Sequence, residues 1–160
     1  KHKQYPYQFN NNEELYKNLS ACERTIYDIN FFTKRTENFK ENLSNNEKKN
    51  VLTIPFEKFV LNPENYLDSI STLLKAKITN ITKKLLKKNK VPRKKISDGI
   101  SLEIYKRYGW EPSLSGFSER DELNKRRDFV LNQNVSKEYL DILDKLSDNY
   151  EKKYLQDILW

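Results

Sequence analysis

The chain has 160 residues, of which 36% are hydrophobic and 33% charged, and its formal net charge is +7. This length is enough for one domain with its own core, and an aromatic content of 12% argues against an intrinsically disordered chain. No apolar run approaches the roughly 18–20 residues of a membrane span, and the first residues lack the apolar segment of a signal peptide.

Residues 13–43 have the apolar spacing of a helix, after a polar start over residues 1–12. One stripe contains Leu15, Leu19, Cys22, Ile26 and Ile29, and a second follows a predicted break near Asn30 and contains Phe31, Phe32, Phe39 and Leu43. Cys22 is the only cysteine, so no internal disulfide can form, which is typical of a reducing compartment. We therefore expect a cytoplasmic protein with no transmembrane segment.

Residues 51–74 predict a strand, a tight connection and a helix. The short apolar run Val51, Leu52 and Ile54 is typical of a buried strand. Asn62 is a suitable N-cap, and Pro63 suits the first helical position. The apolar residues that follow fall on one helical face: Leu67, Ile70, Leu73 and Leu74. This order indicates an α/β fold within a chain that is otherwise helix-rich.

The stretch from Lys75 to Lys95 carries ten basic residues and no acidic one. It has a partial apolar stripe at Ile78, Ile81, Leu85 and Leu86, and Pro92 is expected to end regular structure. Residues 97–118 read as a loop. Ser118 and Asp121 form a capping-box pattern that begins a helix to about Leu131, and a last helix begins at Asn134 or Ser136 and reaches about Leu155.

The segment Arg93-Lys94-Lys95-Ile96-Ser97-Asp98-Gly99 is the main candidate for a binding site. It combines cations, a hydroxyl and a turn with glycine, and such a loop can hold a phosphate through charge-assisted hydrogen bonds and backbone N–H groups. Arginine offers a bidentate fork and lysine a point charge. The alternative is a solvated basic loop without a ligand.

No conventional catalytic set is present in the sequence. It contains neither a Walker-type loop nor Gly-x-Gly-x-x-Gly. One histidine and one cysteine are too few for a usual zinc site, and the only histidine, His2, lies in the polar N-terminal stretch, away from any Ser-His-Asp pattern.

Residues 51–95 resemble the later half of the sulfotransferases that use 3′-phosphoadenosine 5′-phosphosulfate. That half often carries an apolar strand, an aromatic-acidic pair, an apolar pair, then Asn-Pro and a helix with spaced leucines. Here the matching pieces are Val51 to Ile54, Phe56-Glu57, Phe59-Val60, Asn62-Pro63, and the leucine-rich helix to Leu74. The final helix, VSKEYLDILDKLSDNYEKKYL, is similar to the closing helix of the family.

The resemblance implies an α/β fold, namely the helix-rich C-terminal part of a P-loop-like sulfotransferase domain with one or two strands. It implies that Arg93, Lys94 and Lys95, with Ser97, contact the 3′-phosphate of the nucleotide donor. The acceptor would be a small molecule or glycan with a hydroxyl or an amine, and no metal would be needed. The sequence departs from the family at Lys95, where glycine is common, and at Asp98-Gly99, which reverses a common Gly-Asp-Trp order.

The resemblance also implies that the chain is a C-terminal fragment. The sequence has no methionine, even at position 1, and no Gly- and Ser/Thr-rich loop with a lysine that would hold the 5′-phosphosulfate. We therefore expect residues 1–160 to be a single domain that lacks the N-terminal donor-binding loop and is not a competent enzyme alone.

Three other functions stay open at this stage. The cations of residues 75–95 could bind nucleic acid through phosphates, or lie on an anionic membrane surface. The chain could also be a helical protein-interaction domain with no ligand.

Overall fold

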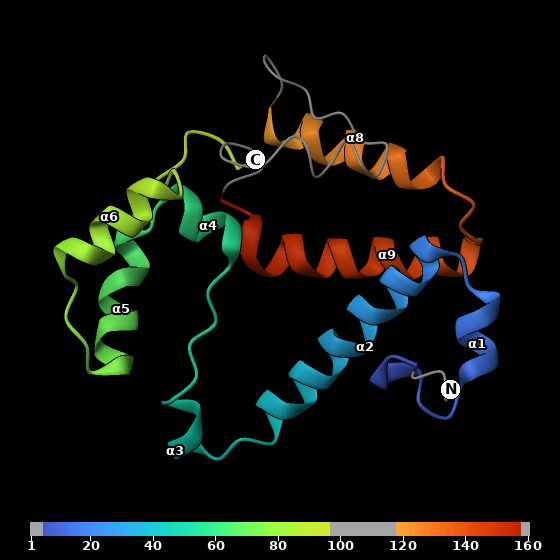
Figure 1. The fold of residues 1–160 in the computed structure, drawn as a ribbon, viewed down its shortest axis with the longest axis horizontal. Coiled ribbons are helices and arrows are strands. Elements are labelled where there is room, and N and C mark those ends of the chain that lie inside the picture. The colour runs from blue at the N-terminus through green and yellow to red at the C-terminus, as the bar shows by residue number, and fades with distance from the viewer. Residues whose placement is uncertain (1–4, 97–117, 158–160) are drawn as a thin grey trace. The chain divides into compact units, whose positions relative to one another are not determined.

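The computed structural model describes residues 5–96 and 118–157, and the regular elements within these ranges are helices (Figure 1). In chain order they are η1 (Tyr7–Phe9), α1 (Glu13–Asn18), α2 (Ala21–Glu41), α3 (Asn45–Lys48), α4 (Phe56–Leu61), α5 (Glu64–Leu74), α6 (Asn80–Lys88), α8 (Glu119–Leu131), α9 (Lys137–Tyr150) and the π-helical turn η2 (Glu151–Leu155). Within the described residues there is no β-strand, so the predicted α/β, P-loop-like fold with one or two strands is wrong, and the fold is all-α.

The predicted strand fails at residues 51–54, which have no regular secondary structure. A strand needs a neighbouring strand to complete its backbone hydrogen bonds. No other segment of the described chain forms a strand that could pair with residues 51–54. Val51 and Leu52 are 39% and 37% exposed, so this run is not the buried segment that its composition suggested. Burial begins instead at Pro55 and continues with Val60 in α4.

The helix predicted after Asn62-Pro63 is confirmed as α5 (Glu64–Leu74), but its N-cap is Pro63 and not the predicted Asn62, and no side chain caps its start. Pro63 already has helical dihedral angles (φ −64°, ψ −30°), while Asn62 does not (φ −140°, ψ 75°). The fixed φ of proline and its missing N–H suit the first turn of a helix, where that N–H would have no partner within the helix. Pro63 is also fully buried, so it contributes to packing as well as to the helix start.

The predicted break near Asn30 is wrong, because α2 continues through it and the chain breaks earlier, at Ser20. The Ser20 hydroxyl accepts a hydrogen bond from the Glu23 N–H at 3.2 Å, and the Glu23 carboxylate accepts one from the Ser20 N–H at 2.9 Å. This capping box starts a new helix, and it stops α1 from running into α2. The Ser-x-x-Glu pattern of this capping box, from Ser20 to Glu23, can be recognised in the sequence.

The described chain divides into two compact units. Of the described residues, unit 1 comprises 5–43 and 125–151, and unit 2 comprises 44–96, 118–124 and 152–157. The expectation of a single domain stays a prediction. None of the helices in the part of the chain that the structure describes is long and apolar enough to cross a membrane.

The core of unit 1 is formed by side chains from η1, α2 and α9, and by Leu19, which precedes α2. Phe9, Leu19, Ile26 and Tyr139 are buried together. Phe9 is fully buried, stacks on Tyr27 with ring centroids 4.6 Å apart, and meets the edge of Tyr16 at 5.0 Å. Through these aromatic contacts, the stretch that the sequence marks as polar, residues 1–12, contributes a core side chain at Phe9.

Unit 2 contains α4, α5 and α6, which lie close to one another in Figure 1. Its buried apolar side chains are Val60, Leu67, Val91 and Leu155. The Lys58 ammonium lies 2.6 Å from the Asp157 carboxylate, so an ion pair joins α4 to the segment after η2. Both side chains of this ion pair are partly exposed to solvent, so the pair adds little to the stability of the fold.

Glu23 joins two helices of unit 1 through one carboxylate. Its Oε2 accepts from the Ser20 N–H, and its Oε1 accepts from the Ser136 N–H at 2.9 Å. Ser20 is the N-cap of α2 and Ser136 the N-cap of α9. Figure 1 shows the N-terminal ends of these two helices side by side. The side chain is 8% exposed, and the negative charge sits at the positive ends of both helix dipoles.

These hydrogen bonds favour the ionised carboxylate. The backbone N–H of Ser136, followed by that of Ser20, lowers the pKa of Glu23 from 4.5 to about 2. Because a protonated carboxyl group accepts these hydrogen bonds less well than the carboxylate does, protonation of Glu23 in the folded state costs free energy.

The Glu23→Gln variant should therefore unfold more easily. One of the two backbone N–H groups loses its acceptor, since an amide has one oxygen, and we expect a loss of about 1–3 kcal/mol in the free energy of unfolding. Chemical denaturation measures this loss. Glu37→Gln, an exposed substitution on the same helix, is the control and should change stability by less than about 0.5 kcal/mol.

Acid should weaken unit 1 in a defined window of pH. The folded pKa of Glu23 lies below its unfolded value, so its contribution is complete above pH 4.5 and is lost as the pH falls towards about 2. Denaturation measured across this range should give a steeper decline for the natural chain than for Glu23→Gln. Parallel pH profiles for the two proteins would contradict this role of the carboxylate.

Candidate phosphate-binding site

The candidate site is the loop of residues 89–96, which begins where α6 ends. The Thr79 hydroxyl accepts a hydrogen bond from the Thr82 N–H and so caps the start of α6. At the other end, Lys90 takes a left-handed conformation (φ 54°), and the Val91 N–H donates to the Leu86 carbonyl. Val91 is buried, so the loop is tied to unit 2 before its cations begin.

Arg93 is held by its backbone and by its side chain. Its N–H donates to the Val60 carbonyl at the end of α4, at 2.7 Å. Its Nη1 donates to the Ile96 carbonyl at 3.0 Å, which closes a short turn within the loop. The guanidinium lies over the Phe56 ring, 5.4 Å from the centroid, a cation–π arrangement that favours the charged group.

One donor of this guanidinium remains without a partner. The Arg93 Nε is buried and has no hydrogen-bond acceptor among the residues that the structure describes. A buried donor without an acceptor costs about 1–3 kcal/mol, so an anion oxygen that reached the Nε after a shift of the side chain would offset that cost. Arginine recognises phosphate and sulfate well, because its fork matches two of their oxygens.

The other residues that are predicted to contact the phosphate lie close to Arg93 in the sequence. Lys94 and Lys95 are exposed and add two positive charges next to Arg93. Ser97, with Asp98 and Gly99, lies outside the described residues, so its predicted contact with phosphate is untested. The nearest described neighbours in the chain carry no negative charge, because residues 75–95 contain none. The described side chains of this arrangement, Arg93, Lys94 and Lys95, carry the positive charge that an anion needs.

Sequence reasoning missed the two groups that hold Arg93 in place, the Val60 carbonyl and the Phe56 ring. Phe56 and Val60 were noted only as an aromatic residue and an apolar residue before a helix. A backbone carbonyl leaves no signal in a sequence, and the approach of Arg93 to Phe56 spans 37 positions and depends on packing. Of this site, only the positive charge of the loop could be predicted from the sequence.

Comparisons with family models, with curated proteins and with solved structures find no match for this chain. The resemblance to sulfotransferases therefore stays a prediction that rests on the residues quoted above. Within the described ranges, no three His, Cys, Asp or Glu side chains are grouped so that they could hold a metal ion.

Inorganic phosphate should change the environment of the Arg93 Nε–H, because this buried donor would gain an acceptor. We expect its resonance in a nitrogen–proton NMR spectrum to shift downfield as phosphate is added. Arg127 is the internal control, since its Nε already donates to Asp144 at 2.8 Å and should move little. Equal shifts for both arginines, or no shift at Arg93, would show that this loop is not an anion site.

Proposed function

We propose that this chain holds the 3′-phosphate of a 3′-phosphoadenosine nucleotide, as part of a sulfotransferase. The observation that carries the proposal is the buried Nε of Arg93, a hydrogen-bond donor without an acceptor in the described part of the chain. Arg93 lies in a loop that is held in place by the hydrogen bond from its N–H to the Val60 carbonyl. Two lysines follow Arg93 in this loop. This is the loop in which the family resemblance predicts 3′-phosphate contacts.

The proposed roles follow from the chemistry of each side chain. Arg93 supplies directed N–H groups, and Lys94 and Lys95 supply positive charge. Ser97 would add a hydroxyl. In the whole reaction, the acceptor's oxygen or nitrogen bonds to sulfur as the bridging sulfur–oxygen bond breaks, which leaves 3′-phosphoadenosine 5′-phosphate. That product keeps the 3′-phosphate, so it is a suitable probe of the proposed site.

The proposal does not depend on a strand within these residues. The phosphate contacts come from a loop between helices, and the loop is positioned by α4 and α6. The proposed contribution of the chain is therefore binding, with no catalytic residue.

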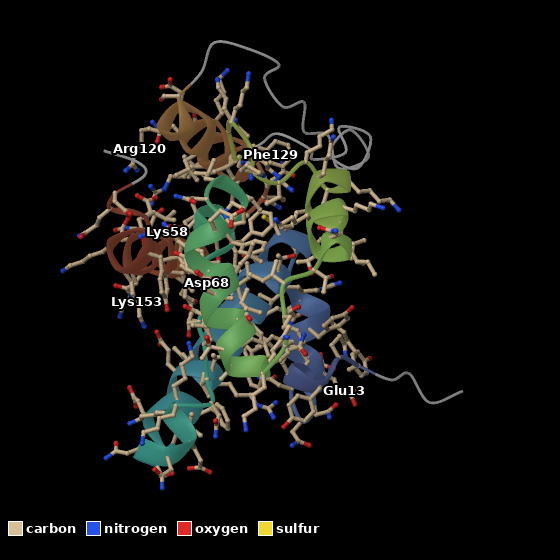
Figure 2. The ribbon with its side chains drawn as sticks, turned by 90° about the vertical axis from the view of Figure 1, so that its left-hand side faces the viewer. Glu13, Lys58, Asp68, Arg120, Phe129 and Lys153 are labelled. Carbon is tan, nitrogen blue, oxygen red and sulfur yellow. The ribbon has the colours of Figure 1, made fainter. Side chains whose placement is uncertain are left out.

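A second candidate is a nucleic-acid-binding module. It is favoured by the density of charge on α6, where Lys83, Lys84, Lys87 and Lys88 are all exposed. Figure 2 shows nitrogen-tipped side chains that extend away from the α6 ribbon. A polynucleotide would contact many of these cations at once, whereas a mononucleotide needs only the loop.

The two candidates make different predictions for nucleotide binding. We expect 3′-phosphoadenosine 5′-phosphate to bind about tenfold more tightly than adenosine 5′-phosphate, since one charge-assisted contact is worth about 1.4 kcal/mol or more. Replacing Arg93, Lys94 and Lys95 by alanine should remove this difference. Calorimetric titration of both nucleotides into both proteins measures it.

The matched control replaces Lys83, Lys84 and Lys87 on α6 by alanine. It removes the same charge and should keep the preference for the 3′-phosphate. Unchanged affinity in the loop variant would contradict the proposed site. If both variants instead lost affinity for a single-stranded oligonucleotide, with a steep dependence on salt, the nucleic-acid function would replace the nucleotide one.

A further inference from the structure

Helix α6 presents a face on which aliphatic and cationic side chains alternate. Ile81, Lys84, Leu85 and Lys88 follow one another at i, i+3, i+4 and i+7, so they lie along one side of the helix. Ile81 is 69% exposed and Leu85 is 54% exposed. Two large aliphatic side chains one turn apart thus remain in contact with solvent.

The rest of α6 shows that this face points away from unit 2. Thr82 and Leu86, also one turn apart, are partly buried and form the inner side of the helix. Lys83 and Lys87 lie on a third side, away from both Leu86 and the Ile81–Leu85 pair, because each residue turns the helix by about 100°. The apolar stripe predicted from Ile78 to Leu86 is therefore divided, with Leu86 turned inwards and Ile81 and Leu85 outwards.

We propose that the α6 face formed by Ile81, Lys84, Leu85 and Lys88 binds the surface of a membrane that contains anionic lipids. Aliphatic side chains can enter the boundary between headgroups and acyl chains, while neighbouring lysines extend their ammonium groups to lipid phosphates. Residues 75–95 contain no acidic side chain that would repel such a surface. The helix would lie on the bilayer and not cross it.

The composition of the face favours a bilayer over other partners. A polynucleotide gains from the lysines, but it offers nothing apolar to Ile81 and Leu85. A folded protein partner needs an interface of about 1,000 Å² or more, and two exposed aliphatic side chains are a small part of that. A lipid surface needs only a few inserted side chains, because its charge adds attraction over the whole basic segment.

Binding to vesicles tests the proposal. The intact chain should co-sediment with vesicles of phosphatidylserine and phosphatidylcholine in equal parts, and about tenfold less with phosphatidylcholine alone. Ile81→Gln with Leu85→Gln should weaken binding to the anionic vesicles about tenfold or more, because the apolar insertion is lost. Far-UV circular dichroism checks that the double variant keeps its helix content.

A matched pair of lysine variants separates this face from general charge attraction. Lys84→Gln with Lys88→Gln should weaken binding about tenfold, whereas Lys83→Gln with Lys87→Gln should weaken it less than about threefold. Both pairs remove the same charge from the same helix. Equal losses in the two pairs, with no effect of the Ile81 and Leu85 changes, would overturn the proposal and indicate a purely electrostatic partner such as a polynucleotide. Absence of binding to anionic vesicles would also overturn it.

Discussion

The ionised carboxylate of Glu23 is the constraint on which unit 1 depends. It accepts from the N-cap backbone groups of α2 and α9, which lie 116 positions apart in sequence (Ser20 and Ser136). A helix start leaves N–H groups without partners, and burying two starts together would be costly without a shared acceptor. The core of Phe9, Leu19, Ile26 and Tyr139 forms beside it. Apolar packing and this carboxylate therefore specify the same arrangement of the two helices.

Unit 2 is held together in another way, because loop residues contact the ends of its helices. Pro63 is the N-cap of α5 and is buried, and the Arg93 N–H donates a hydrogen bond to the Val60 carbonyl, near the end of α4. The loop after α6 is thus fixed before any ligand binds, although it is rich in cations that repel one another. A fixed loop loses less conformational entropy on binding an anion than a mobile one. This pre-organisation is the physical basis for assigning the anion site to the loop and not to the whole basic stretch.

The basic stretch therefore has two distinct surfaces. The loop concentrates charge around one arginine whose Nε lacks an acceptor within the described chain, whereas α6 spreads charge along a helix beside Ile81 and Leu85. A small anion suits the first and an extended anionic surface suits the second. The same composition, ten cations in 21 residues, offers these two different surfaces for the proposed binding because the helix ends at Lys88 and the chain turns at Lys90.

Local sequence signals correctly predicted helical structure over much of residues 13–43, a helix after Asn62-Pro63, a helix to about Leu131, a last helix beginning at Asn134 or Ser136, and the charge of residues 93–95. These are local properties, set by caps, proline and apolar spacing within a few residues. The local signals did not predict α3 or α4. Tertiary structure decided that residues 51–54 form no strand, because a strand exists only if another segment pairs with it. It also decided which apolar residue of α6 is partly buried, and which distant groups, Phe56 for Arg93 and Ser136 for Glu23, complete each interaction. Such contacts depend on how helices pack, and helix packing depends on side chains far apart in the chain.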